Sequence, residues 1–209
     1  MILWTIRHTK PFNPKDICYG RLDLDVSPSF PEEYPPVLEA LKKANVAPVK
    51  IFSSPLQRSY KLAQKVGEFL NQPVEKAEEI IEVNFGSWEG QKLNETPRDE
   101  MAAWKADLRG YKFKNGESFH EVDDRMDKLL HKNFEDFPNT EVMWVSHAGI
   151  IASVMHRYCG VPDNDFVEGR FHYAMVTRFE FDKVDGKLVC KKMENIFDGL
   201  PMKPLDVAG

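Results

Sequence analysis

The chain has 209 residues, of which 42% are hydrophobic and 29% charged, and its formal net charge is -5. These values are typical of a globular protein with its own core and exclude the disordered and fibrous classes. The negative net charge gives no general attraction to nucleic acid or to an anionic membrane, so any anion that binds must meet a local cluster of arginines.

The N-terminal run from Ile2 to Ile6 is apolar and predicts a buried strand. It is shorter than the apolar region of a secretion signal and has no basic segment before it. No other stretch approaches the roughly 18 apolar residues that a membrane span needs. The three cysteines have no CxxC spacing, which fits a reducing compartment. We therefore expect a cytoplasmic protein without membrane association.

Apolar runs and segments with helical periodicity alternate along the chain. The strands expected to be covered on both faces are residues 2–6, 49–53 and 141–146. The expected helices are residues 31–44, 57–70, 98–107, 118–134 and 150–158, the fourth of which opens with Ser118 and Glu121 as a capping box. This alternation predicts a layered α/β fold with a mostly parallel central sheet.

The C-terminal part of the chain has the pattern of an antiparallel hairpin. Residues 175–182 alternate apolar and polar side chains, Asp185-Gly186 supplies a tight turn, and residues 187–193 can pair back. We expect this hairpin at one edge of the sheet and an extended tail from Asn195 onward. No internal repeat or linker divides the chain, so one domain is expected.

Cationic and imidazole side chains follow the predicted strands where each one ends. Arg7 and His8 follow the first strand, Arg58 follows the second and His147 follows the third. Ligands of open α/β sheets bind beyond the carboxyl ends of the strands, so these residues are expected to meet there. Guanidinium groups match phosphate oxygens, and a helix that starts after His147 adds backbone N–H groups. The pattern predicts a phosphoryl site that needs no metal and no cofactor.

The same residues suggest a covalent mechanism. A neutral imidazole is nucleophilic near pH 7, so attack by His8 on phosphorus would give a phosphohistidine that water then hydrolyses. The leaving oxygen needs a proton donor, and the candidate is Glu82, whose apolar and aromatic neighbours would raise its pKa. Deprotonated Glu82 would then act as the base toward water.

Five segments together resemble the histidine phosphatase superfamily, which also contains the cofactor-dependent phosphoglycerate mutases. They are residues 6–9 (Ile-Arg-His-Thr), 18–23 (Cys-Tyr-Gly-Arg-Leu-Asp), 53–59 (Ser-Ser-Pro-Leu-Gln-Arg-Ser), 82–90 (Glu-Val-Asn-Phe-Gly-Ser-Trp-Glu-Gly) and 145–149 (Val-Ser-His-Ala-Gly). The resemblance implies a nucleophile at His8, phosphate-binding arginines at Arg7 and Arg58, a second histidine at His147 and a general acid at Glu82.

The resemblance also implies a three-layer α/β/α fold like that of phosphoglycerate mutase. It describes one domain over residues 1–209, with residues 91–116 as a cap-like insertion. Within the family, Arg-His-Thr-x-Pro followed by Cys-Tyr-Gly-x-x-Asp is similar to the α-ribazole phosphatase branch, which serves cobalamin assembly. The mutase pattern Arg-His-Gly-Glu is absent, and Pro14 stands where mutases carry an asparagine. Phosphatase activity is therefore favoured over mutase activity.

Several residues keep two interpretations. Arg21 could reach the phosphate, or it could be held in its loop by Asp23 or Asp25. Cys18 and Cys159 lack the arginine six residues later that a cysteine-dependent phosphatase has, so we do not expect cysteine chemistry. The remaining histidines lack metal-ligand spacing, although His172 could line the rim of the site; they are His120, His131, His156 and His172.

The aromatic residues of segment 91–116 have two interpretations. Trp104, Tyr111 and Phe113 could stack on a heterocyclic substrate, or they could form a small core under the cap. The expected partner is a small phosphorylated metabolite whose identity the sequence leaves open, and so is the oligomeric state. A phosphoglycerate mutase-type phosphotransferase and a non-catalytic phospholigand-binding protein remain as alternatives.

Overall fold

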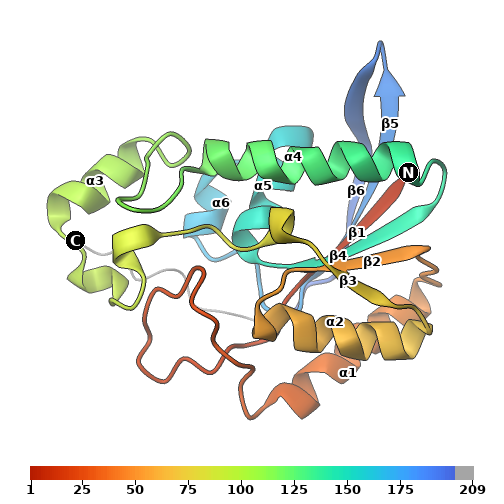
Figure 1. The fold of residues 1–209 in the computed structure, drawn as a ribbon, viewed down its shortest axis with the longest axis horizontal. Coiled ribbons are helices and arrows are strands. Elements are labelled where there is room, and N and C mark those ends of the chain that lie inside the picture. The colour runs from red at the N-terminus through yellow and green to blue at the C-terminus, as the bar shows by residue number, and fades with distance from the viewer. Residues whose placement is uncertain (201–209) are drawn as a thin grey trace.

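Six strands form one mixed sheet in the computed structural model, which describes residues 1–200 (Figure 1). The strand order is β3-β2-β4-β1-β5-β6. The strands are β1 (Ile2–Arg7), β2 (Lys50–Ser53), β3 (Val74–Lys76), β4 (Glu141–Ser146), β5 (Val176–Val184) and β6 (Lys187–Phe197). The first four strands of the sheet pair in parallel, and β5 and β6 add an antiparallel edge. The predicted mostly parallel sheet with an edge hairpin is confirmed.

Helices cover both faces of this sheet (Figure 1). The α-helices are α1 (Phe30–Lys43), α2 (Gln57–Leu70), α3 (Arg98–Ala106), α4 (Phe119–Asp136), α5 (Ala148–Cys159) and α6 (Asn164–Val167), and the short 3-10 helices are η1 (Glu78–Ile80), η2 (Gly86–Trp88) and η3 (Leu93–Glu95). Helices α1 and α2 lie on one face, whereas α4 and α5 lie on the other. The three-layer α/β/α arrangement that the resemblance implies is therefore present.

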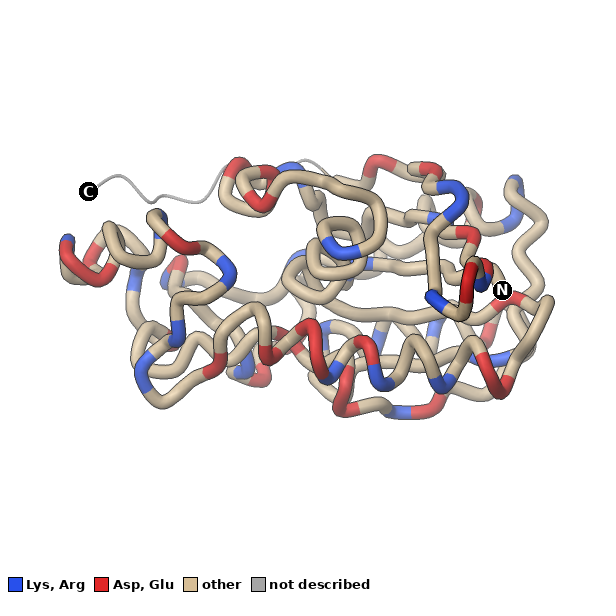
Figure 2. The backbone as a smooth tube through the Cα atoms, turned by 90° about the horizontal axis from the view of Figure 1, so that it is seen from above, with Lys and Arg blue, Asp and Glu red and all other residues tan. Residues whose placement is uncertain are grey.

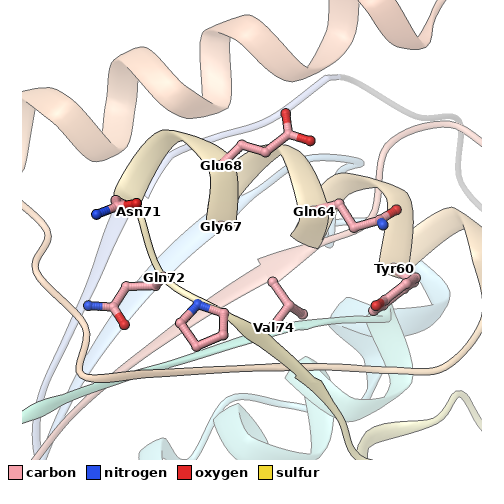
Figure 3. Close-up of a pocket in the computed structure, with 8 residues that line it drawn as sticks. Tyr60, Gln64, Gly67, Glu68, Asn71, Gln72 and Val74 are labelled. Atoms are coloured by element: carbon pink, nitrogen blue, oxygen red, sulfur yellow. The ribbon is translucent and has the colours of Figure 1, made fainter.

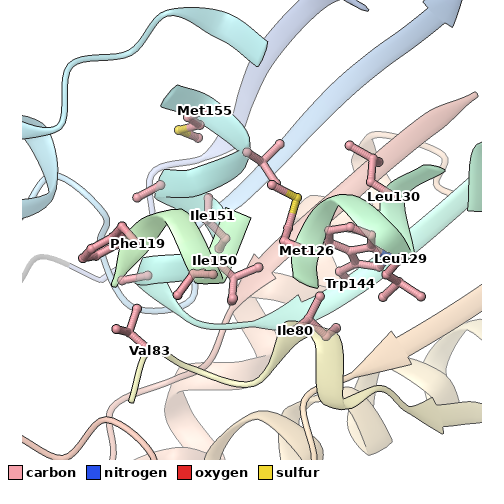
Figure 4. Packing of buried hydrophobic residues seen from close by; sticks show 14 of the residues in the cluster. Ile80, Val83, Phe119, Met126, Leu129, Leu130, Trp144, Ile150, Ile151 and Met155 are labelled. Carbon is pink, nitrogen blue, oxygen red and sulfur yellow. The ribbon is translucent and has the colours of Figure 1, made fainter. Parts of the chain in front are cut away.

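Each face of the sheet has its own buried cluster. On the side of α4 and α5, Met126, Trp144 and Ile150 are fully buried and pack together (Figure 4). On the side of α1 and α2, Ile6 and Val145 belong to a second cluster. Because neighbouring residues of β1 and β4 contribute to opposite clusters, both strands need apolar residues in succession, which is the pattern that identified them.

The helix boundaries agree with the sequence to within a few residues, and the capping box of α4 is present. The Ser118 hydroxyl accepts a hydrogen bond from the Glu121 amide at 3.4 Å, and the Glu121 carboxylate accepts one from the Ser118 amide at 2.8 Å. These two bonds satisfy backbone donors that an uncapped helix would leave without partners. Helix α4 therefore begins where the sequence predicted.

The short helix α6, the 3-10 helices and strand β3 were not predicted, and the expected C-terminal tail differs from the structure. Strand β3 was missed because it is only three residues long and two of them, Glu75 and Lys76, are exposed. The tail expected from Asn195 is wrong for its first residues, because β6 continues to Phe197. A register shift pairs Thr177 with Asn195 and Val176 with Phe197, so the strand continues although the alternation of side chains is broken. The remainder of that expected tail, residues 201–209, lies outside the described residues.

The register of the sheet aligns the carboxyl ends of β1, β2 and β4. Arg7 pairs with Ser146 across β1 and β4, and Ser53 pairs with Val145 across β2 and β4. The loops after these strands therefore start side by side at the carboxyl edge of the sheet. In residues 1–200, no helix is both long and apolar enough to span a membrane.

Candidate active site

The residues predicted from the strand ends meet at the carboxyl edge of the sheet. The His8 amide donates a hydrogen bond to the Ser146 carbonyl at 2.9 Å, which continues the pairing of β1 with β4. The imidazole rings of His8 and His147 lie edge to face, with their centroids 5.1 Å apart. His8, Arg58 and His147 are all 0% exposed. Two histidines separated by most of the chain thus share one buried site.

The hydrogen bond of His8 fixes its tautomer. Nδ1 lies 2.6 Å from the Thr9 carbonyl oxygen, and a carbonyl can only accept, so the proton is on Nδ1. Nε2 then carries the lone pair, and it has no hydrogen-bond partner among residues 1–200. Burial lowers the pKa of His8 well below its usual value, and the positive charges of Arg58 and Arg7 lower it further. His8 is therefore a neutral imidazole with one free nitrogen, as a nucleophile requires.

His147 is oriented by two hydroxyl groups. Its Nε2 lies 2.7 Å from the Ser54 hydroxyl and 3.4 Å from the Ser59 hydroxyl, while Nδ1 has no partner among the described residues. Burial is also the first cause that lowers the pKa of His147, followed by the charge of Arg58. His147 is the N-cap residue of α5, so the first backbone N–H groups of that helix follow it directly in the chain.

Arg7 and Arg58 flank the two imidazoles. Arg7 donates to the Phe171 carbonyl, and its guanidinium lies 4.2 Å from the centroid of the Tyr173 ring. Both side chains are buried, and burial lowers the pKa of Arg58, although a guanidinium remains charged at neutral pH. The site therefore concentrates positive charge in a desolvated environment.

Arg58 also holds the loop that follows β1. It donates to the Leu22 carbonyl at 2.8 Å and to the Gly20 carbonyl at 2.5 Å, and it stacks on Tyr19 at 4.9 Å. Its Nε has no partner among the described residues. The second predicted strand thus delivers an arginine that both orders residues 19–22 and adds charge beside His8.

Glu82 lies at the start of α5. Its Oε1 accepts hydrogen bonds from the Val83 amide at 2.9 Å and from the Gly149 amide at 3.2 Å. Burial raises the pKa of this carboxyl group, and the nearby arginines oppose that shift only in part. A Cβ atom on residue 149 would lie 2.4 Å from Oε1, so the glycine of the Ser-His-Ala-Gly motif makes room for Glu82.

Arg21 is held by a glutamate and a carbonyl group. Its Nε donates to the Glu82 carbonyl at 3.2 Å, and one terminal nitrogen pairs with Glu117 at 3.0 Å. The predicted alternative, in which Asp23 or Asp25 holds Arg21, is wrong. Asp23 instead accepts from the Gln57 amide and Asp25 pairs with Lys61, because these acids face α2.

Sequence reasoning missed two tyrosines of the site. The hydroxyl groups of Tyr19 and Tyr173 lie 3.3 Å apart, and their ring centroids are 6.4 and 5.7 Å from that of His8. Each ring also faces one of the two arginines. Tyr19 was inside a recognised motif and could have been found, whereas the sequence around Tyr173 carries no signal.

Other residues that the sequence analysis considered have contacts of a different kind. Burial, followed by the charge of Glu89, raises the pKa of Cys18 to about 12, so its thiol is not a nucleophile near neutral pH. The Nδ1 atom of His172 lies 3.1 Å from the Asp198 carbonyl. Trp104 is 2% exposed and Phe113 is 1% exposed, and both pack against Trp88. These two aromatic side chains form a small core.

The charge of the site is local. In the view of Figure 2, the positions of basic and acidic residues are interspersed along the described backbone. A surface depression of about 490 Å³ between α2 and β3 is lined by Gln64, Glu68, Asn71 and Gln72 among others, and by no lysine or arginine (Figure 3). It therefore does not suit a phosphate. In residues 1–200, no group of three or more His, Cys, Asp or Glu side chains could hold a metal ion.

Comparisons with known proteins agree on one family. The family model "Histidine phosphatase superfamily (branch 1)" matches residues 3–194. Phosphoserine phosphatase 1 of Hydrogenobacter thermophilus is 29% identical over 146 residues, which cover 68% of each chain. The adenosylcobalamin/alpha-ribazole phosphatase of Escherichia coli is 26% identical over 130 residues, 60% of this chain and 61% of that protein. The native structure of a mycobacterial glucosyl-3-phosphoglycerate phosphatase superposes with a TM-score of 0.74 at 25% identity and covers 85% of this chain and 89% of its own.

Proposed function

This chain belongs to the histidine phosphatase superfamily, branch 1, as a phosphoric monoester hydrolase, and we propose that it works through a phosphohistidine at His8 without a metal ion. The observation that carries this proposal is the state of His8. Its Nδ1–H is bound to the Thr9 carbonyl, its Nε2 lone pair is free, and two arginines lie beside it. A nucleophile and the cations that its substrate needs thus share one buried site.

In the first step, the Nε2 lone pair of His8 attacks phosphorus and the bond to the ester oxygen breaks. Arg7 and Arg58 stabilise the charge on the three equatorial oxygens. His147 can donate through Nδ1 while neutral, provided that the Ser54 hydroxyl donates to its Nε2, and their separation of 2.7 Å fits that bond. Glu82 protonates the departing alkoxide, for which its raised pKa is suited.

In the second step, water hydrolyses the phosphohistidine. Glu82, now a carboxylate, accepts a proton from the water as its oxygen attacks phosphorus, and the bond from phosphorus to Nε2 breaks. The electron pair of that bond returns to the imidazole, so His8 is again neutral and Glu82 is again protonated. The products are an alcohol and inorganic phosphate. The same groups serve both steps in reversed roles.

The proposed substrate is a small cytoplasmic phosphomonoester, and α-ribazole 5'-phosphate is the first candidate. The support is the motif from Cys18 to Asp23 together with the similarity to the Escherichia coli enzyme. Phosphoserine is the second candidate, because the Hydrogenobacter phosphoserine phosphatase has the higher identity of the two relatives. A role in cobalamin assembly depends on the first candidate.

The test is phosphate release in the presence of EDTA across a panel of phosphomonoesters. The panel contains α-ribazole 5'-phosphate, phosphoserine, 3-phosphoglycerate, sugar phosphates and an aryl phosphate. We expect turnover that EDTA does not reduce, and a strong preference for one compound identifies the substrate class. Phosphate transfer that depends on a bisphosphorylated primer would indicate a mutase instead. Tight ligand binding without phosphate release on any compound would indicate a binding protein.

A further inference from the structure

The backbone of Glu82 is held by two arginines that lie outside the phosphoryl site. Its carbonyl accepts a hydrogen bond from Nε of Arg21 at 3.2 Å and another from a terminal nitrogen of Arg125 at 3.1 Å. Arg125 also donates to the Glu79 carbonyl at 2.7 Å. The segment that carries Glu82 is therefore attached to the loop after β1 and to α4.

Glu117 joins the two arginines into one cluster. Its Oε1 lies 3.0 Å from Arg21 and 2.8 Å from Arg125, and its Oε2 accepts from Nε of Arg125 at 3.2 Å. Oε1 also accepts from the Asn84 amide at 2.9 Å. The side chains of Glu117 and Arg125 are only 13% and 16% exposed. Solvent therefore screens this cluster less than it screens an ion pair at the surface.

The carboxyl group of Glu82 depends on this attachment. Its side chain accepts two hydrogen bonds at Oε1, both from backbone amides, those of Val83 and Gly149. No side chain donates to it in those contacts, so its position follows from the position of its backbone. A general acid must lie within hydrogen-bond reach of the leaving oxygen, and a displacement of about 1 Å can cost about 10²-fold in rate.

We propose that Arg21, together with Glu117 and Arg125, is a positioning residue that holds Glu82 against the leaving group, and that Arg21 does not bind the phosphoryl group. This inference rests on the proposed function, because it needs Glu82 as the general acid. Two of the three guanidinium nitrogens of Arg21 are already bonded toward Glu82 and Glu117. Positioning Glu82 is a third role for Arg21, distinct from binding the phosphate and from holding its own loop.

The two roles of Arg21 differ in their dependence on the leaving group. An alkyl phosphate releases a strongly basic alkoxide that needs a proton, whereas a nitrophenyl phosphate releases a weakly basic phenolate that departs without one. Loss of a residue that positions the general acid therefore slows alkyl esters selectively. Loss of a residue that binds the phosphoryl group slows both esters alike, because both carry the same group.

The experiment compares kcat/KM for an alkyl and a nitrophenyl phosphate in Arg21→Gln, Glu117→Gln and the reference variant Glu82→Gln. We expect Glu82→Gln to lose about 10²-fold on the alkyl ester. Arg21→Gln and Glu117→Gln should each lose about tenfold on it and less than about threefold on the nitrophenyl ester. Arg178→Gln is the matched control, since Arg178 pairs with Glu180 and Glu194 on the hairpin. This control should leave the ratio of the two rates unchanged.

Each outcome decides a different point. An equal loss on both esters in Arg21→Gln would mean that Arg21 binds the phosphoryl group, and no loss on either would mean that it has no role; both overturn the inference. A selective loss in Glu82→Gln alone overturns the inference and leaves the proposed function intact. If Glu82→Gln itself shows no selectivity, Glu82 is not the general acid and the proposed function fails at that residue. The ratio is measured within each variant, so partial unfolding lowers both rates and does not imitate the expected result.

Discussion

The carboxyl edge of the sheet and the segment of residues 91–116 differ in what their buried side chains contribute to the stability of the fold. At the edge, His8, Arg58 and His147 are fully buried, and each has a nitrogen without a hydrogen-bond partner among the described residues. Each such group costs about 1–3 kcal/mol of folding free energy. In the segment, Trp104 and Phe113 are buried against other aromatic rings, which stabilises the fold by about 0.5–1.5 kcal/mol per pair beyond the burial of area.

This contrast separates the residues that cost stability from those that supply it. Buried polar groups without partners call for an explanation such as a ligand, and in the proposed function a phosphoryl group would meet these atoms of His8, His147 and Arg58. The rings of Trp104 and Phe113 pack against each other and leave little surface for a ligand, although the indole nitrogen of Trp104 also lacks a hydrogen-bond partner among the described residues. We therefore expect substitutions at the edge to change rates and substitutions in the segment to change the free energy of unfolding.

The largest effect is expected for His8→Ala. Removal of the nucleophile should lower kcat/KM by at least about 10³-fold and abolish the phosphohistidine. Phosphate release and mass spectrometry after an alkaline quench measure both quantities. The free energy of unfolding, measured by urea titration, should change by less than it does in Trp104→Ala. A variant that still turns over and still carries the covalent phosphate would overturn the assignment of His8.

Trp104→Ala tests the other side of the comparison. Loss of this 2% exposed side chain should lower the free energy of unfolding by about 3–5 kcal/mol, because a large cavity remains among the rings. Turnover of a nitrophenyl phosphate by the folded protein should stay within about threefold of the parent. Trp104→Phe is the control and should lose less stability. If Trp104→Ala is as stable as the parent but prefers different substrates, the ring contacts the ligand and the contrast between the two regions is lost.

Gly149→Ala should lower both the rate and the free energy of unfolding. The new methyl group would lie 2.4 Å from Oε1 of Glu82 and 2.5 Å from a methyl carbon of the buried Val83, so both side chains must shift. We expect about 10–100-fold slower hydrolysis of alkyl phosphates, because the general acid is displaced. The free energy of unfolding should fall by about 1–3 kcal/mol, because overpacking against Val83 outweighs the preference of alanine for a helix.

A double variant sharpens this test. In Glu82→Gln, the carboxylic acid is already lost, so adding Gly149→Ala should slow alkyl ester hydrolysis only slightly more. Fully additive losses would show that residue 149 acts on the site by some route other than Glu82. Kinetics of the two single variants and the double variant are sufficient to decide.

The smallest effect is expected from pH. His8 must be neutral to attack, and its lowered pKa means that activity rises with pH through a value below 6.5. Glu82 must be protonated, and its raised pKa means that activity on alkyl esters falls as pH rises through a value above 4.5. The profile of kcat/KM should therefore be bell-shaped. Glu82→Gln should remove the descending limb, and a limb that persists in this variant would belong to another group.

The sequence predicted the parts of the site that depend on strand ends. Arg7, His8, Arg58 and His147 could be found because parallel strands bring their carboxyl ends to one edge. Tyr173 could not be found, because a tyrosine in an irregular stretch has no periodic or motif context. Asp23 and Asp25 were wrongly expected to hold Arg21. Its actual partner, Glu117, lies 96 residues away in sequence, and only the packed fold brings the two together.

The strands of the sheet also divide into those that the sequence pattern predicted and those that it missed. Strands with continuous apolar runs, such as β1 and β4, were predicted almost to the residue, because burial on both faces determines their composition. The short strand β3 was missed because Glu75 and Lys76 are exposed, and the end of β6 near Asn195 was missed because a register shift breaks the alternation of its side chains. Tertiary pairing, which no local window contains, determines such segments.

The contact between Tyr19 and Tyr173 has a consequence for the timing of the reaction. His8 has no exposed surface, and these partly exposed rings lie against it with their hydroxyl groups 3.3 Å apart. For the proposed reaction, a phosphomonoester would reach Nε2 only when neighbouring groups separate, and the alcohol and the phosphate would leave by further openings. In the proposed mechanism, opening and closing of these groups would therefore accompany the two chemical steps, and the closed state would limit how much bulk water meets the site.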